Sequence, residues 1–292
     1  MRPLDECNPM VTVLYFLFVL SVSMFTMNPV ILGVSLVFSV LFFCLMDKKV
    51  GFKRHIWYIV LLVVLTLINP LVYHNGVTVL FILNDNPVTL EALLYGLVSA
   101  VKIVSALYWF RSFSLIMTED KLLYCMGRLS PKTALVLSMT LRYVPLFKAQ
   151  AGKVSASQKA IGFYKEDSLI DRVRGALRIF SILVTWALEN GIITADSMGA
   201  RGYGTGRRTS FSLIRFTKND AILLSVLAVL FVPAGLFVFL KQGEPVFYPA
   251  IIFPASGLKA WAAYLVFTLL ALVPELLLLE DRLSWKYYLS KA

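Results

Sequence analysis

Residues 55–74 read HIWYIVLLVVLTLINPLVYH, a run of apolar side chains without any Asp, Glu, Lys or Arg. A helix that crosses the roughly 30 Å hydrocarbon core of a bilayer needs about 20 predominantly apolar residues. This run is long enough, so it predicts a transmembrane helix. The class of the whole chain then depends on whether similar runs flank it.

Five more apolar runs of comparable length occur, at 10–27, 29–46, 90–117, 220–240 and 259–279. The first two are separated only by Asn28 and Pro29, so they form either two spans or one broken element, which leaves five or six spans open. We therefore predict an all-α membrane protein with about six transmembrane helices.

The composition excludes the common soluble classes. Hydrophobic residues make up 59% of the 292 residues and charged residues 15%, and the mean hydropathy is +0.77. A soluble domain carries about 25% charged and 45–50% apolar residues, and disordered chains have low hydrophobicity. A soluble enzyme and a disordered protein are thus both excluded.

The net charge of +11 is a topology signal. Basic residues are frequent in the loop 47–55 and in the segment 118–218, which holds 16 of them against 7 acidic residues, a net of +9. The stretch 75–89 has no Lys or Arg, and 241–258 has only Lys241. Under the positive-inside rule this alternation predicts six spans with both termini in the cytoplasm. The surplus of basic residues therefore indicates no nucleic-acid partner.

The basic segment has helical periodicity. Ser130 and Pro131 are a favourable start for one helix, and a second begins near Ser168. The second helix has one stripe of apolar residues at helical spacing, namely Leu169, Val173, Ala176, Phe180, Leu183 and Ala187, with Arg172, Arg174 and Arg178 on the opposite face. We predict three parts: transmembrane helices in 1–117, long cytoplasmic amphipathic helices in 118–218, and transmembrane helices with a cytoplasmic tail in 219–292.

Motifs for chemistry are missing from the sequence. It has no G-x-x-x-x-G-K-[ST] phosphate loop, no HExxH and no Ser/His/Asp set, and its two histidines are too far apart to build a metal site. Glu91 and Lys102 are the two charges that we place well inside the predicted spans. So few charges disfavour an ion-coupled transporter, which usually needs carboxylates or broken helices near the midplane of the bilayer. The apolar centre of 75–89, residues 77–83, is too short to span and predicts a short outside-facing element that lies either on the membrane or on the protein.

The stretch 195–209, ADSMGARGYGTGRRT, resembles the Ala-Arg-Gly signature of the transmembrane T component of energy-coupling factor (ECF) transporters, a family that also includes the cobalt-transport permease. Ala200, Arg201 and Gly202 match that signature, and Gly199 stands where the family usually has Glu. The LRYVPL stretch at 141–146 is similar to another segment of the family.

The family has a second element, usually Q-x-A-R-G, ahead of the long amphipathic helix. The matching stretch here is QKAIG, with Ile161 in the place of the arginine. This departure implies that the first coupling contact is weakened or is taken over by Lys159 or Lys165. The residues of this degenerate motif are Gln158, Lys159, Ala160, Ile161 and Gly162.

The resemblance implies a coupling subunit that is not an enzyme and binds no cofactor itself. Two ATP-binding cassette subunits would hold ATP–Mg and dock at the arginine motifs, and the apolar stripe would cradle one substrate-binding S component. The complex would import a vitamin or a transition metal such as cobalt or nickel across the plasma membrane of a prokaryote. From the residues alone, a self-sufficient secondary transporter and a membrane anchor with a lipid-binding basic domain stay open.

Overall fold

The computed structural model describes residues 7–46, 52–73, 76–83, 86–162, 169–206, 214, 216–253 and 257–291. The chain forms two compact units, one made of 1–122 with 214–292 and the other of 123–213. Some residues that the sequence singles out lie outside the described part, namely 47–51, His74, Lys165, Ser168 and 207–209.

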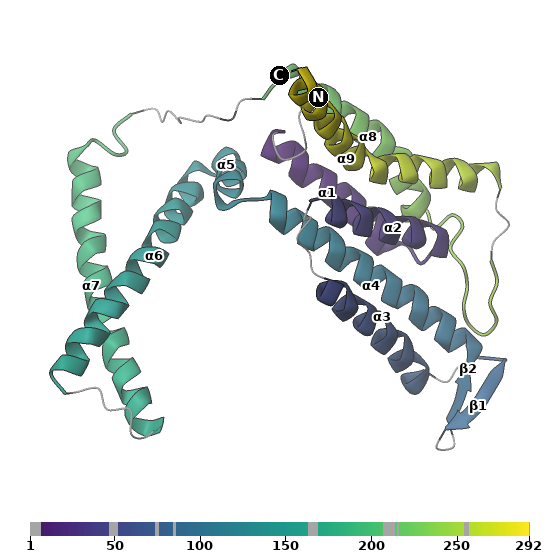
Figure 1. The fold of residues 1–292 in the computed structure, drawn as a ribbon, viewed down its shortest axis with the longest axis horizontal. Helices are drawn as coiled ribbons and strands as arrows, with labels where there is room; N and C mark the ends of the chain where they lie inside the picture. Colours follow the sequence, from purple (N-terminus) through teal and green to yellow (C-terminus); the bar gives the residue numbers. More distant parts are fainter. Residues whose placement is uncertain are drawn as a thin grey trace. The chain divides into compact units, whose positions relative to one another are not determined.

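The first unit is a helical bundle with one small hairpin (Figure 1). Its helices match the predicted spans, and the prediction of an all-α membrane protein is confirmed. Five of them are long and apolar enough to cross a bilayer, whereas α1 is slightly shorter. The elements are α1 Pro9–Phe25, α2 Pro29–Met46, α3 Phe52–Val72, β1 Val79–Leu83, β2 Asn86–Thr89, α4 Leu90–Ile116, α8 Lys218–Phe239 and α9 Leu258–Lys291.

Asn28 separates the first two helices. Its side-chain oxygen accepts a hydrogen bond from the backbone N–H of Val30 at 3.0 Å, which caps the start of α2, and Pro29 takes the first helical position. Its side-chain amide donates to the carbonyl of Gly243 and to the hydroxyl of Tyr264, each at 2.8 Å. The first two apolar runs are therefore two separate helices.

The core of this unit is built around α1. The rings of Tyr15 and Phe16 lie edge-on to Trp109 of α4, with centroids 6.1 and 6.0 Å apart. The Trp109 indole N–H donates to the hydroxyl of Ser35 at 3.1 Å, and that hydroxyl lies 3.0 Å from the hydroxyl of Ser23. These buried polar groups hydrogen-bond across three helices, as is common where helices pack within a membrane.

The last helix is longer than the predicted span 259–279. No Gly or Pro follows Pro274 before the end of α9 at Lys291, so nothing in the sequence stops the helix. The guanidinium of Arg282, which lies beyond the predicted span, donates to the carbonyl of Leu45 near the end of α2.

The charges inside the spans differ from the prediction in their positions and in their number. Glu91 lies in the first turn of α4, where its carboxylate accepts the backbone N–H of Thr78. Lys102 lies further along α4 and is half-buried. A third ionisable residue was missed: Glu275 of α9 is 7% exposed, and its Oε1 has no hydrogen-bond partner among the described residues.

The second unit contains two long helices that cross each other, α6 Pro131–Ala160 and α7 Leu169–Ala200 (Figure 1). The Tyr143 hydroxyl lies 3.2 Å from the Thr194 hydroxyl at this crossing, and the Phe147 ring lies edge-on to Trp186 with centroids 5.7 Å apart. A shorter helix, α5 Glu119–Leu129, precedes them and contains the division between the units.

Candidate functional site

The C-terminal end of α7 carries the Ala-Arg-Gly motif. Ala200 is the last helical residue, and Gly202 has a φ of +77°, a left-handed conformation that favours glycine. The N–H of Gly202 donates to the carbonyl of Gly199 at 2.9 Å, and the N–H of Tyr203 donates to the carbonyl of Met198 at 3.0 Å. These two bonds form a Schellman motif, which satisfies the last carbonyls of the helix and fixes the position of the residue between helix and glycine.

The C-terminal end of α6 has the same geometry. Ala160 is its last helical residue, Gly162 has a φ of +78°, and the N–H of Gly162 donates to the carbonyl of Lys159 at 3.0 Å. The N–H of Ile161 bonds to Ser157, just as the N–H of Arg201 bonds to Ser197. The two ends therefore share the pattern Ser-x-x-Ala-x-Gly. The two motifs of the sequence analysis did not include this serine.

Arg201 and Ile161 hold equivalent places at these ends. Both side chains are exposed, Ile161 by 64%. The carbonyls at a helix C-terminus carry partial negative charge, so Arg201 is favourably placed there. The arginine can offer its planar donors to a carboxylate on another molecule, whereas Ile161 can offer only an apolar contact. Gln158, the first residue of the degenerate motif, has a shielded Oε1 that has no hydrogen-bond partner among the described residues.

The predicted apolar stripe of α7 is largely uncovered within its unit. Leu169 is 78% exposed, and Val173, Ala176 and Phe180 are exposed as well. Leu183 and Ala187 are half-buried. The stripe therefore needs a cover that the described part of this unit does not provide.

The apolar surface of α7 is broader than the predicted stripe. Exposed apolar side chains lie on its other faces too, at Ile170, Leu177, Leu188, Ile192 and Ile193. By length and composition α7 is itself among the helices that could cross a membrane. Arg172, Arg174 and Arg178 lie near its N-terminal end, and all three are exposed. The basic residues within α7 are thus confined to its first turns.

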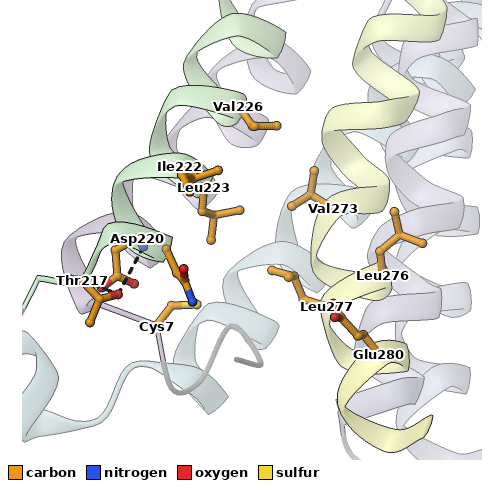
Figure 2. Close-up of a pocket in the computed structure, with 11 residues that line it drawn as sticks. Cys7, Thr217, Asp220, Ile222, Leu223, Val226, Val273, Leu276, Leu277 and Glu280 are labelled. Carbon is orange, nitrogen blue, oxygen red and sulfur yellow. Dashed lines mark hydrogen bonds between the residues drawn. The ribbon is translucent and has the colours of Figure 1, made fainter. Parts of the chain in front are cut away.

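A cavity of about 320 Å³ belongs to the other unit, between the start of α8 and the second half of α9 (Figure 2). Its walls are mostly apolar, with Leu223 and Val226 on α8 and Val273 on α9. Asp220 lies at its lower end in Figure 2, where it forms a capping box with Thr217. None of the residues predicted for the site lines this cavity.

The matched family model is described as CbiQ, cobalt transport protein, and it covers residues 2–213. Several curated proteins are also similar. An energy-coupling factor transporter transmembrane protein EcfT of Listeria innocua is 34% identical over 111 residues, 37% of this chain and 41% of that protein. The EcfT protein of Leuconostoc gelidum is 24% identical over 189 residues, 61% of this chain and 69% of that protein.

This chain spans about two fifths of the length of the first curated relatives, and 41% of the Listeria innocua protein. The family model is broader, since it takes in α1 to α7, including both helix ends described above. Because the model matches well over half of the sequence, the chain belongs to the CbiQ cobalt transport protein family, as a multi-pass membrane protein related to the T components of energy-coupling factor transporters.

Proposed function

We propose that this chain is the coupling subunit of an ATP-driven uptake transporter of the energy-coupling factor type and has no ATPase activity of its own. The observation that carries the proposal is the shared geometry of the ends of α6 and α7. Each end holds one exposed side chain, Ile161 or Arg201, on a glycine turn. The small residues beside it, such as Ala200 and Gly202, allow a partner surface to approach closely.

ATP–Mg is bound by two ATP-binding cassette subunits, one at each helix end. The sequence of this chain contains no phosphate-binding loop motif, which supports the location of ATP hydrolysis in the partners. Arg201 enters a groove on one ATPase and forms a bidentate ion pair with a carboxylate there. Ile161 enters the other groove through an apolar contact, so the two contacts differ in strength.

A substrate-binding S component covers the apolar surface of α7. This surface needs an apolar partner because most of its large side chains are exposed within the unit. The transported substrate is a vitamin or a transition-metal ion such as cobalt or nickel, bound by the S component and not by this chain. Both termini lie in the cytoplasm of a prokaryotic cell, in agreement with the distribution of Lys and Arg.

The test is co-purification of tagged ATPase subunits with the full-length chain from membranes, together with ATP hydrolysis in reconstituted vesicles. Arg201→Glu reverses the charge at the proposed contact, so we expect the loss of one or both ATPase subunits and of coupled activity. Arg174→Glu makes the same change at an exposed position near the other end of α7, away from the apolar stripe, and should leave the complex intact. Normal assembly of Arg201→Glu, at equal membrane expression, would contradict the proposal.

A secondary transporter is the second candidate, and Glu275 is the observation that favours it. A buried carboxylate inside a span is the kind of residue that ion-coupled transporters use. Uptake by the chain alone, driven by an ion gradient without ATP and abolished in Glu275→Gln, would support this alternative. Under the proposed function, Glu275→Gln retains ATP-driven uptake.

A further inference from the structure

The hairpin between α3 and α4 extends beyond the ends of these two helices (Figure 1). β1 and β2 pair antiparallel, with Phe81 opposite Val88 and Ile82 opposite Pro87. Leu80 lies at an irregularity of the pairing, as in a β-bulge. Connections between neighbouring helices usually take about 2–8 residues, so the longer connection between Val72 and Leu90 requires an explanation of its own.

The base of the hairpin is held in place by the first turn of α4. The carboxylate of Glu91 accepts the N–H of Thr78 at 3.1 and 3.3 Å, and the carbonyl of Thr78 accepts the N–H of Leu90 at 3.0 Å. Gly76 lies so close to this carboxylate that a Cβ there would be 2.6 Å from the Glu91 Oε2. Contacts of this kind fix the direction in which the hairpin leaves the bundle.

Strand β1 exposes apolar side chains on both faces of the hairpin, whereas Val88 of β2 is buried. Phe81 is 55% exposed and Ile82, the next residue, is 69% exposed, although successive side chains of a strand point to opposite faces. A sheet that packs on a protein core usually presents a polar face to water. A partner that docks flat on the hairpin would cover one face and leave the other in water, whereas immersion in lipid covers both faces.

The hairpin continues an apolar surface that belongs to a membrane span. The neighbouring end of α3 exposes Leu71, Val72 and Tyr73, and α3 is among the helices long and apolar enough to cross a bilayer. No charged side chain occurs in the described residues 76–83 and 86–90. Tyr73, at the end of the span, is of the residue type that is enriched where hydrocarbon meets the headgroups.

The depth of the hairpin follows from its backbone. A two-stranded sheet leaves the outward-facing N–H and C=O groups of both strands unpaired, and such groups are not tolerated in contact with hydrocarbon. They are tolerated among the headgroups, where water is present, while apolar side chains reach the boundary of the acyl chains. We propose that the β1–β2 hairpin is inserted in the headgroup region of the bilayer with both faces in phospholipid, and so anchors the ends of α3 and α4 at the membrane surface.

Site-directed spin labelling tests the proposal in the full-length chain, alone and with its partner subunits, in phosphatidylethanolamine–phosphatidylglycerol vesicles. The three native cysteines, Cys7, Cys44 and Cys125, are replaced by serine. Labels are then attached in Phe81→Cys and Ile82→Cys, which report the two faces. Val229→Cys, an exposed position within α8, is the lipid control, and Gln242→Cys, an exposed position after α8, is the water control.

The measurement compares collisions of each label with oxygen, which concentrates in lipid, and with a water-soluble nickel chelate. We expect both hairpin labels to give an oxygen-to-nickel ratio several-fold above that of Gln242→Cys and below that of Val229→Cys. A lipid-like ratio at only one of the two positions would overturn the proposal, and so would water-like ratios at both. Shielding of both labels from both reagents would mean that a protein covers the hairpin, which also overturns it.

Discussion

Arg201, after α7, and Ile161, after α6, occupy equivalent positions in two helix-ending turns of the same type. Each follows the last helical residue, an alanine, and precedes a glycine with φ close to +78°, and the N–H of each bonds to a serine four residues earlier. The backbone therefore presents Arg201 at the end of α7 and Ile161 at the end of α6 in the same conformation. What differs between the two ends is the chemistry of the side chain, and with it the kind of surface that each end can bind.

Ile161→Arg tests whether the two ends bind different surfaces. If the partner of the α6 end is complementary to isoleucine, an arginine there loses apolar burial and places a charge against an apolar groove. We expect the affinity for the ATPase subunits to fall about tenfold, or roughly 1.4 kcal/mol. Ile161→Val keeps the apolar character and should stay near the wild type. The affinities are compared by titration of the purified subunits; a tighter complex with Ile161→Arg would show that this groove is acidic.

Gly202→Ala tests the turn that positions Arg201. An alanine with a φ of +77° costs about 1–2 kcal/mol, so we expect the last turn of α7 to fray and ATPase binding to weaken although Arg201 is intact. Gly199→Ala is the matched control, since a Cβ there meets nothing within 4 Å and the position is helical. It should stabilise the helix end by roughly 0.5–1 kcal/mol.

Hydrogen exchange measures the effect directly. The N–H of Tyr203, which bonds to the carbonyl of Met198, should exchange faster in Gly202→Ala and no faster in Gly199→Ala. Equal exchange and equal ATPase binding in both variants would show that the glycine turn does not position Arg201.

The membrane spans could be predicted from the sequence because they are local signals. An apolar run of about 20 residues predicts a span wherever it occurs, and a glycine after a helical pattern predicts the end of that helix. Gly202 and Gly162 each lie two residues after the last helical residue of α7 and α6, in agreement with this rule. The distribution of exposed apolar residues around α7 was predicted less well, because periodicity reveals a stripe but not which other residues stay uncovered.

Features that depend on distant partners could not be predicted. Residues 77–83 read only as a short apolar stretch, because the pairing of β1 with β2 and the bond from Thr78 to Glu91 depend on the folded chain. Asn28 looks like a simple helix cap, although its amide bonds to groups 215 and 236 residues away. Glu275 was visible as a single carboxylate in an apolar run, but its burial was not.

Asn28→Ala removes three hydrogen bonds at the junction of α1 and α2. The loss of the α2 cap alone costs about 1 kcal/mol, and the carbonyl of Gly243 and the hydroxyl of Tyr264 each lose a donor. We expect a drop of several degrees in the thermal unfolding midpoint of the detergent-solubilised chain. Asn28→Asp keeps the capping oxygen but cannot donate, so it should fall between Asn28→Ala and the wild type. An unchanged midpoint in Asn28→Ala would mean that the junction is held by packing alone.

Lys241→Gly should stabilise the protein. Helix α8 ends in a Schellman motif in which the N–H of Lys241 bonds to the carbonyl of Val238, and the N–H of Gln242 bonds to that of Phe237. Lys241 takes the position that normally favours glycine and has a φ of +53°. A glycine adopts this left-handed conformation without the steric strain of a side chain, so the free energy of unfolding should rise by about 1 kcal/mol. The unfolding midpoint should then rise by a few degrees.

The matched substitution two residues later should act in the opposite direction. Gly243 has a φ of +81°, and a Cβ there would lie 2.8 Å from the ring of Phe237, so Gly243→Ala adds a steric clash to backbone strain. We expect its unfolding midpoint to fall while that of Lys241→Gly rises. The pair is measured by differential scanning fluorimetry in one detergent. A lower midpoint for Lys241→Gly would mean that contacts of the lysine side chain outweigh the strain of its backbone, because both variants keep the same helix-ending hydrogen bonds.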